Sequence, residues 1–301
     1  MRVFVTGVGG QLGHDVMKEL FSRGIEGIGS DLAPVYTGSA DAAAASLPYE
    51  SCDITDAEAV KEVLGRVRPD AVIHCAAWTA VDAAEDPANR EKVFRINAQG
   101  TANIAACCRQ LNAKMLYLST DYVFDGSGSL PWQIADRTCP LNVYGMSKLQ
   151  GEEAVRALLP RSFILRTSWV FGAGGRSFVS TMLRLGQERQ LLQVVNDQVG
   201  SPTYTLDLAQ LIADMIVTDR YGVYHASNEG YCSFAEFARA ILQLSGSHSR
   251  VQAIASEEYP CAARRPRNSR LSKQSLDEAG FRRLPPWEDA LRRFLAEYPR
   301  T

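Results

Sequence analysis

Short apolar runs alternate with longer segments of helical periodicity over the first half of the chain. The apolar runs, which predict strands, lie at 3–6, 27–30, 71–75, 115–119 and 163–166. Each run is apolar throughout rather than alternating with polar residues, as is typical of parallel strands buried on both faces. The segments between them predict helices over 11–22, 56–66, 87–111 and 141–159. This alternation predicts an α/β protein with a Rossmann-type doubly wound parallel sheet and right-handed crossovers.

The regular alternation ends near residue 168, and shorter elements follow. The pattern there predicts a strand near 192–195 and helices near 178–187, 206–217, 234–244 and 287–297. We therefore expect a Rossmann domain over 1–168 and a smaller C-terminal domain over 169–301 that closes over the ends of the sheet. Segments near 190–225 are expected to return to the first domain.

Composition and charge exclude several classes of protein. With 46% hydrophobic and 22% charged residues and a net charge of -2, the chain has the balance of a globular protein. That charge gives no reason to expect nucleic acid or a membrane surface as a partner. The seven cysteines form no metal-ligand spacing, and neither a leader pattern nor a long apolar run is present. These features predict a cytoplasmic protein.

A glycine-rich turn follows the first predicted strand and opens the first helix. Gly7 permits the tight turn, Gly10 allows close approach of a pyrophosphate, and Gly13 lets helix and strand pack closely. The helix N-terminus then offers free N–H groups to an anion. The spacing G-x-x-G-x-x-G differs from the standard G-x-G-x-x-G, so the position after the first strand carries most of the weight. The turn predicts a dinucleotide site.

Asp31 ends the second predicted strand. An acid at this place accepts hydrogen bonds from the adenine ribose hydroxyls and repels a 2′-phosphate, which favours NADH slightly over NADPH. An aspartate that caps a turn is an equally good interpretation from the sequence alone.

Three further residues favour acid–base chemistry beside that cofactor. Tyr144 and Lys148 are four residues apart in a predicted helix and share one face. A neighbouring ammonium lowers the pKa of a phenol, which brings it closer to working pH. Thr120 ends a predicted strand, where its hydroxyl can donate to a substrate carbonyl. The combination favours a hydride-transfer enzyme.

Longer motifs narrow this interpretation. The segments 119–126, 140–145, 166–170, 196–202 and 265–269 resemble those of the dTDP-4-dehydrorhamnose reductases, in the extended branch of the short-chain dehydrogenase/reductase superfamily. The resemblance covers nearly the whole chain. It implies an NAD(P)-binding domain over 1–168, a substrate-binding domain over 169–301, and NADH or NADPH as cofactor.

The resemblance also implies a reaction. It is reduction of the C4 keto group of dTDP-4-dehydro-L-rhamnose to dTDP-L-rhamnose, a precursor of cell-surface polysaccharide. Thr120 would polarise the keto group and Tyr144 would protonate its oxygen. Lys148 would lower the pKa of Tyr144 and bind the nicotinamide ribose.

Further positions take roles from the same resemblance. Asn97 would support the backbone of the active site. The implied cofactor-binding residues are Gly7, Gly10, Gln11, Leu12, Gly13, Asp31, Asp53, Ile54, Ala76, Ala77, Tyr144 and Lys148. The implied substrate-binding residues are Thr79, Val81, Thr120, Asp121, Tyr144, Trp169 and Arg265.

Simpler interpretations stay open for five of these positions. Asn97 fits an exposed helix residue, Ala76 and Ala77 fit sheet core, and Trp169 fits packing at a strand end. Arg265 fits a solvated loop, although guanidinium groups also bind phosphate well.

Several rival functions use the same three catalytic residues. Related dehydratases carry Asp-Glu directly after the hydroxyl residue, whereas Thr120 is followed here by Asp121 and Tyr122. The missing glutamate argues against a dehydratase. An NDP-sugar 4-epimerase, another 4-ketosugar reductase, and a binding subunit resembling the β subunit of methionine adenosyltransferase remain as alternatives.

The last predictions concern metal dependence and assembly. Some reductases of this family dimerise through Mg²⁺ held by glutamates of both subunits, and the matching positions are Asp15, Glu188 and Glu297. One of them is shortened to aspartate, and lone carboxylates on helices are usually solvated. We predict no obligatory metal, a nucleotide-sugar substrate, and a homodimer as an open expectation.

Overall fold

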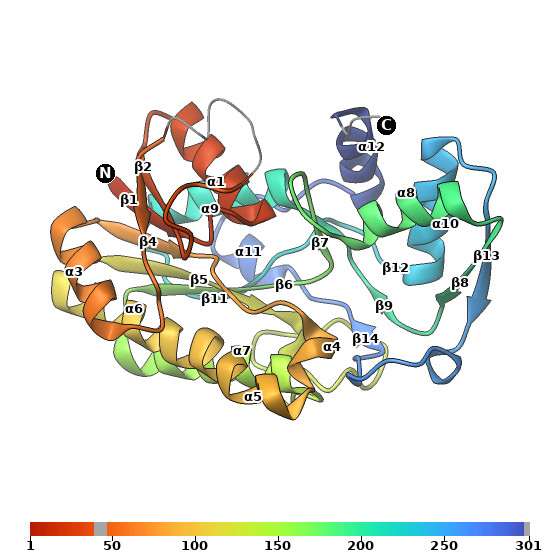
Figure 1. The fold of residues 1–301 in the computed structure, drawn as a ribbon, viewed down its shortest axis with the longest axis horizontal. Helices are drawn as coiled ribbons and strands as arrows, with labels where there is room; N and C mark the ends of the chain where they lie inside the picture. The colour runs from red at the N-terminus through yellow and green to blue at the C-terminus, as the bar shows by residue number, and fades with distance from the viewer. Residues whose placement is uncertain (39–46, 298–301) are drawn as a thin grey trace.

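A seven-stranded parallel sheet forms the centre of the molecule (Figure 1). The computed structural model describes residues 1–38 and 47–297. In spatial order the strands are β11 (Gly222–His225), β6 (Ser162–Thr167), β5 (Lys114–Thr120), β4 (Ala71–His74), β1 (Arg2–Thr6), β2 (Glu26–Asp31) and β3 (Tyr49–Ser51). Chain order reverses between β1 and β4. The predicted doubly wound fold is therefore confirmed.

Helices cover both faces of this sheet (Figure 1). On one face lie α1 (Gln11–Ser22), α9 (Thr205–Ile216) and α11 (Gln274–Glu278), and on the other lie α3 (Ala57–Val67), α6 (Thr101–Leu111) and α7 (Val143–Leu158). The apolar run of β1 serves both layers, because Val3 and Val5 pack with the α1 side and Phe4 packs with the α6 side. Burial on both faces explains why the strand pattern lacks alternation. No helix in the described ranges is long and apolar enough to span a membrane.

Two strands of the sheet lie beyond those that the sequence predicts. β3 has the sequence Tyr-Glu-Ser and β11 has Gly-Val-Tyr-His, so neither contains an apolar run longer than two residues. The chain reaches β11 through α9, which packs against α1. β8 (Leu191–Val195) pairs instead with β13 (Arg250–Ile254) in the C-terminal part. Of the segment 190–225, only its second half lies with the central sheet.

The C-terminal part has a core of its own. It contains α8 (Phe178–Glu188), α10 (Phe234–Ser245), α12 (Trp287–Glu297) and short strands, including β7 (Val170–Phe171), β9 (Val199–Gly200), β10 (Thr203–Tyr204), β12 (Cys232–Ser233) and β14 (Asn268–Ser269). Phe171, Phe237 and Phe294 are fully buried in this core. Ser233 and Glu236 form a capping box that starts α10.

The predicted helix 87–111 has an irregular middle. It consists of α5 (Pro87–Phe94), a π-helical turn η1 (Arg95–Gly100) and α6. π turns often occur at functional sites because they redirect one side chain. Here the turn buries Asn97 completely. A sequence pattern of period 3.6 cannot reveal such a turn.

Gly151 lets α7 lie close to the sheet. A Cβ atom there would meet the hydroxyl oxygen of Tyr117 at 2.3 Å and the carbonyl oxygen of Asn97 at 2.6 Å. We expect Gly151→Ala to lower the free energy of unfolding by about 1–3 kcal/mol, because the helix must move outward. Urea unfolding monitored by circular dichroism measures this change.

Gly65, in the middle of α3, is the matched control. A Cβ atom added to it would have no atom within 4 Å apart from the backbone of its own helix. Gly65→Ala should therefore raise the free energy of unfolding by about 0.5–1 kcal/mol, since alanine is the better helix former. Equal effects of the two substitutions would contradict the close approach at Gly151.

Candidate active site

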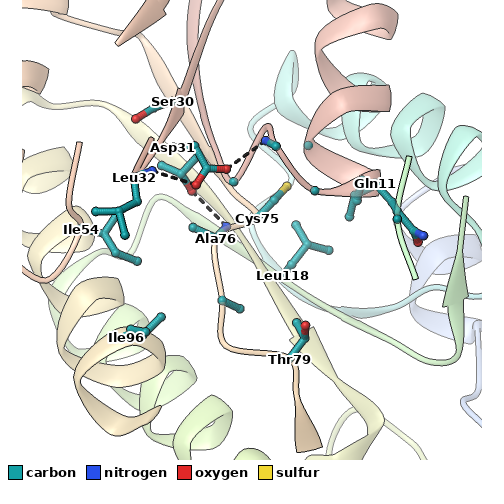
Figure 2. Close-up of a pocket in the computed structure, with 18 of the residues that line it drawn as sticks. Gln11, Ser30, Asp31, Leu32, Ile54, Cys75, Ala76, Thr79, Ile96 and Leu118 are labelled. Atoms are coloured by element: carbon teal, nitrogen blue, oxygen red, sulfur yellow. Dashed lines mark hydrogen bonds between the residues drawn. The ribbon is translucent and has the colours of Figure 1, made fainter. Parts of the chain in front are cut away.

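A cleft of about 780 Å³ lies at the carboxyl ends of the central strands (Figure 2). It is lined by thirteen of the predicted site residues: Gly7, Gly10, Gln11, Leu12, Gly13, Asp31, Asp53, Ile54, Ala76, Ala77, Thr79, Tyr144 and Lys148. The predicted residues outside its lining are Val81, Thr120, Asp121, Trp169 and Arg265. The cleft therefore brings the glycine turn and the Tyr144/Lys148 pair into one space.

The glycine turn is as tight as its residues suggest. Gly7 has φ +74°, and a Cβ on it would lie 2.6 Å from the amide nitrogen of Ala76. A Cβ on Gly13 would lie 2.3 Å from the carbonyl oxygen of Gly7. Gly10 caps α1 without any side-chain hydrogen bond, so the helix N-terminus keeps free amides. These features fit a bound dinucleotide diphosphate.

Asp31 has two structural roles at once. Its carboxylate accepts hydrogen bonds from the backbone N–H of Gly9 at 2.9 Å and of Leu32 at 2.8 Å (Figure 2). It also lines the cleft. Asp31 therefore stabilises the glycine turn and also lies where it can contact a ligand in the cleft.

The first turn of α7 positions Tyr144. Asn142 caps this helix, accepting from the backbone N–H of Gly145 at 2.8 Å, and it donates to the carbonyl oxygen of Arg264 at 2.8 Å. Gly145 packs against the backbone of Tyr122, where a Cβ would lie 2.3 Å from the carbonyl oxygen. The sequence therefore ties the start of α7 to the loop after β5.

The hydroxyl groups of Thr120 and Tyr144 lie together. Burial raises the pKa of Tyr144 to about 12, and a hydrogen bond with Thr120 opposes that rise. This reverses the expectation that Lys148 lowers the pKa of Tyr144. The physical reason is that desolvation dominates the phenol, while the Lys148 ammonium lies 4.1 Å from the centre of the Tyr117 ring.

Lys148 is a buried amine. Its side chain is nearly inaccessible, and burial lowers its pKa to about 7, opposed by Glu152 and Cys75. Its backbone carbonyl accepts from the Tyr117 hydroxyl at 3.1 Å. The amine is therefore close to its titration point near neutral pH.

Behind Lys148 lies a fully buried ion pair between Glu152 and Arg166. The guanidinium of Arg166 donates to both carboxylate oxygens of Glu152, each at 2.8 Å. The hydroxyl of Ser119 donates to the same carboxylate at 2.5 Å, and Arg156 donates at 2.8 Å. This network joins α7 to β5 and β6 next to Thr120.

Asn97 holds the backbone beside the cleft. Its amide accepts from the N–H of Trp78 at 2.8 Å and donates to the carbonyl of Trp78 at 3.1 Å. It also donates to the hydroxyl of Ser147 at 2.9 Å. The loop after β4 and the inner face of α7 are thereby held together, and the interpretation of Asn97 as an exposed helix residue is wrong.

The predicted substrate residues outside the cleft lining lie in packed surroundings. Trp169 has φ +48° and stacks on Phe234 with ring centroids 3.7 Å apart, and Arg265 pairs with Asp82 at 2.5 Å. Asp121 is buried beside Thr120, and that burial raises its pKa to about 7. Val81 begins the short helix α4 (Val81–Ala84). The packing interpretation of Trp169 describes the contact seen here.

Several lining residues were not predicted from the sequence. The additional charged ones are Lys92, Arg95 and Arg176. Arg176 follows a run of glycines at 172, 174 and 175, and this run was the available signal. No sequence signal marks Lys92 and Arg95, because charged positions on a helix are usually solvated.

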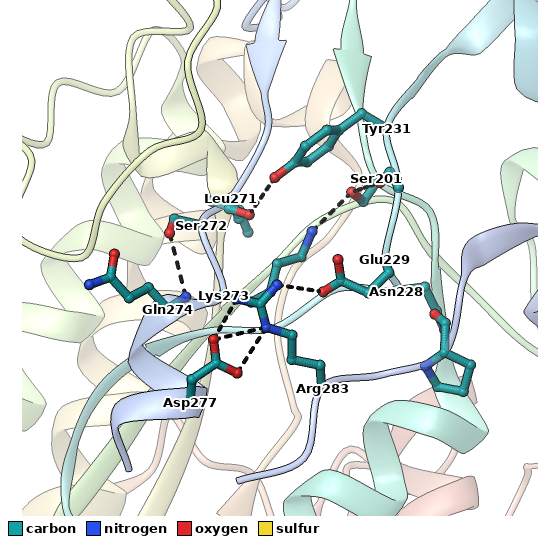
Figure 3. A network of polar contacts seen from close by, with 12 residues as sticks. Ser201, Asn228, Glu229, Tyr231, Leu271, Ser272, Lys273, Gln274, Asp277 and Arg283 are labelled. Atoms are coloured by element: carbon teal, nitrogen blue, oxygen red, sulfur yellow. Dashed lines mark hydrogen bonds and ion pairs between the residues drawn. The ribbon is translucent and has the colours of Figure 1, made fainter. Parts of the chain in front are cut away.

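A second buried lysine lies outside the cleft lining (Figure 3). Lys273 lies over the Tyr231 ring at 4.5 Å and donates to the Ser201 hydroxyl at 3.5 Å, and burial lowers its pKa to about 8. Ser201 in turn donates to the carbonyl of Gly230 at 2.6 Å. The lysine braces the loop that follows β9.

Two of the three candidate magnesium positions share a neighbour, and the third has a partner elsewhere. Asp15 and Glu297 both act on Tyr204, whose pKa is raised mainly by burial. Glu188 pairs instead with Arg184 at 2.8 Å, at the end of α8. Within 1–38 and 47–297, no cluster of three or more potential ligands is suited to a metal ion.

The doubly wound sheet, the glycine turn and the Tyr-x-x-x-Lys helix define an NAD(P)H-dependent oxidoreductase of the extended short-chain dehydrogenase/reductase class. Residues 1–300 match the family model described as the RmlD substrate binding domain. The chain belongs to the dTDP-4-dehydrorhamnose reductase family.

Relatives and a solved structure agree with this assignment. The chain is 39% identical to the spore coat polysaccharide biosynthesis protein SpsK of Bacillus subtilis, over 98% of this chain and 97% of the relative. It is 36% identical to dTDP-4-dehydrorhamnose reductase of Aggregatibacter actinomycetemcomitans, over 98% of each. The crystal structure of the Bacillus anthracis dTDP-4-dehydrorhamnose reductase in complex with NADP aligns with a TM-score of 0.90 and 39% identity, over 99% of each chain.

Burial of Lys148 yields a prediction about stability and pH. The pKa of its amine is about 7 in the folded protein against 10.5 in the unfolded chain, so the unfolded chain binds the extra proton between these values. Wild-type stability should therefore rise with pH in this window relative to Lys148→Met. We expect Lys148→Met to be more stable by roughly 2–4 kcal/mol at pH 7, with the gain vanishing near pH 10.5.

Urea unfolding of both proteins at several pH values measures this difference. Lys92→Met, which removes an exposed amine from the cleft rim, serves as the control and should show no such pH-dependent gain. A stability difference between Lys148→Met and wild type that stays constant from about pH 7 to 10.5 would show that the amine is solvated.

Proposed function

We propose that this protein reduces the C4 keto group of dTDP-4-dehydro-L-rhamnose to give dTDP-L-rhamnose. The observation that carries the proposal is the pairing of the Thr120 and Tyr144 hydroxyls, because Tyr144 lines the same cleft as Asp31 and the glycine turn. Membership of the reductase family supports the same substrate. The sugar nucleotide then lies between the first domain and the C-terminal part. The residues near it are Thr79, Val81 and Asp121 of the first and Trp169 and Arg265 of the second.

Tyr144 is the proton donor in this proposal. A bound reduced nicotinamide supplies the hydride. With a pKa of about 12, the phenol stays protonated at neutral pH and is ready to donate to the oxygen formed at C4. The Thr120 hydroxyl donates a second hydrogen bond to that oxygen, which stabilises the developing negative charge.

Lys148 has a separate task. Its amine titrates near neutral pH, so a developing phenolate at Tyr144 favours its charged form. The charged amine also suits a hydroxyl of the nicotinamide ribose, since an ammonium carries three donors. Glu152 and Arg166 keep the helix that bears it against the sheet.

We further infer the setting in which the enzyme works. It acts in the cytoplasm, as a homodimer and without an obligatory metal, and its partner molecule is the nucleotide sugar. The competing functions are a 4-epimerase, a reductase of another 4-ketosugar, and a non-catalytic binding subunit.

The direct test is oxidation of NADH, in parallel with NADPH, on dTDP-4-dehydro-L-rhamnose made in situ. We expect substrate-dependent oxidation with dTDP-L-rhamnose as the product. Tyr144→Phe should bind cofactor normally and lose about 10²–10⁴-fold in kcat, because the proton donor is gone.

Other outcomes separate the rivals. Interconversion of C4 epimers without net oxidation of added cofactor would indicate an epimerase. Cofactor binding without turnover on any 4-keto sugar nucleotide would indicate a binding subunit. Full turnover by Tyr144→Phe would remove that residue from the mechanism.

Asp31 generates a prediction about cofactor choice. Its carboxylate faces the cleft and would repel a 2′-phosphate, so we propose a slight preference for NADH. Asp31→Asn keeps an oxygen for one backbone N–H and removes the charge. The ratio of kcat/KM for NADH to that for NADPH should fall roughly ten-fold. An unchanged ratio would restrict Asp31 to holding the glycine turn.

A further inference from the structure

The loop between β7 and α8 brings an arginine of the C-terminal part to the cofactor cleft. Gly174, Gly175 and Arg176 line the same cleft as the glycine turn, although they lie far from it in the sequence. Gly174 has φ +76°, which favours glycine. Two glycine-rich segments therefore line one space.

This loop lies directly against the start of α1. A Cβ on Gly175 would lie 2.8 Å from Cγ and 2.9 Å from Nε2 of Gln11, the first residue of that helix. The Nε2 atom of Gln11 is buried and has no hydrogen-bond partner among the described residues. Arg176 follows Gly175 and lines the same cleft, so the loop brings this arginine close to the N-terminal end of α1.

The charges around the cleft single out Arg176. Four cationic side chains line it: Lys92, Arg95, Arg176 and Lys148. Lys92 and Arg95 come from α5 and η1, near Ile96, and Lys148 is packed on Tyr117. Within the described ranges, Arg176 makes no hydrogen bond or ion pair and its side chain is exposed. Of the four cations, Arg176 is the one whose loop lies next to the glycine turn and the start of α1.

The glycine turn lacks a cation of its own. Between Thr6 and Gly13 there is no lysine or arginine, and the first turn of α1 contributes only backbone amides and its dipole. A dinucleotide diphosphate bound there would be an anion without a cationic partner on this segment. Guanidinium groups match phosphate oxygens with two parallel hydrogen bonds.

We propose that Arg176 binds the diphosphate of the nicotinamide dinucleotide from the C-terminal side of the cleft. The amides of α1 and the guanidinium of Arg176 then hold the diphosphate from opposite sides. The identity of the ligand rests on the proposed function. Because the loop leads directly into α8, bound cofactor fixes the C-terminal part relative to the sheet.

Cofactor affinity tests this role without any sugar nucleotide. The dissociation constants of NADH and NADPH are measured by fluorescence titration for the wild type, Arg176→Ala and Arg176→Lys. We expect Arg176→Ala to bind both about ten-fold more weakly, as for loss of a charge-assisted hydrogen bond. Arg176→Lys should recover part of the affinity, since it keeps the charge and loses the planar fork.

Two comparisons make the test specific. Arg189→Ala removes another exposed arginine, at the opposite end of α8, and should bind like the wild type. In competition against NADH, ADP-ribose should lose affinity for Arg176→Ala to the same degree, whereas adenosine, which has no phosphate, should not.

Three results would overturn the inference. Unchanged dissociation constants in Arg176→Ala would show that the guanidinium does not reach the diphosphate. An equal loss for adenosine would indicate a general distortion of the cleft. Unchanged cofactor binding with a raised KM for the sugar nucleotide would assign Arg176 to the substrate's diphosphate. If the wild type binds neither dinucleotide, the proposed function fails as well, whereas absence of turnover with intact binding leaves the inference standing.

Discussion

The buried ion pair of Glu152 and Arg166 is the contact on which the active site depends. Both side chains are almost wholly inaccessible, and their two hydrogen bonds tie α7 to β6 while Ser119 adds β5. Removing one partner of such a pair typically costs about 3–5 kcal/mol, because the other charge stays buried. Lys148 lies one helical turn before Glu152, and Thr120 directly follows Ser119. The pair thus holds the segments that carry Lys148 and Thr120 in the candidate active site.

Several ionisable groups near this pair are buried, and their burial lowers the stability of the folded protein. The amine of Lys148, the carboxyl of Asp121 and the phenol of Tyr144 are each desolvated, and the pKa of each moves toward its neutral form. Large apolar clusters on both faces of the sheet offset these costs. The apolar layers therefore supply the stability that the buried ionisable groups of the pocket remove, as expected where function opposes stability.

The sequence was most informative where its pattern has a direct physical cause. Five strands of the central sheet and the long helices were visible because two-sided burial and helical periodicity leave a clear trace. β3 and β11 were not visible, because neither has an apolar run longer than two residues. The sign of the Tyr144 pKa shift was wrong, since sequence spacing shows a neighbouring charge and hides desolvation. Arg176 was missed because its place in the cleft depends on how two distant segments pack.

The π-helical turn at η1 carries a consequence for how this chain tolerates a deletion. Such a turn holds more residues than an α-helical turn, so loss of one codon there would leave a more regular helix. Because the wide turn already absorbs the extra residue, the two flanking helices would keep about the same relative orientation, and only the residues of the turn itself would be re-aimed. Asn97 would turn away from Trp78 and Ser147, its present partners. A deletion that makes the helix more regular would thus remove the hydrogen bonds by which Asn97 holds the backbone beside the cleft.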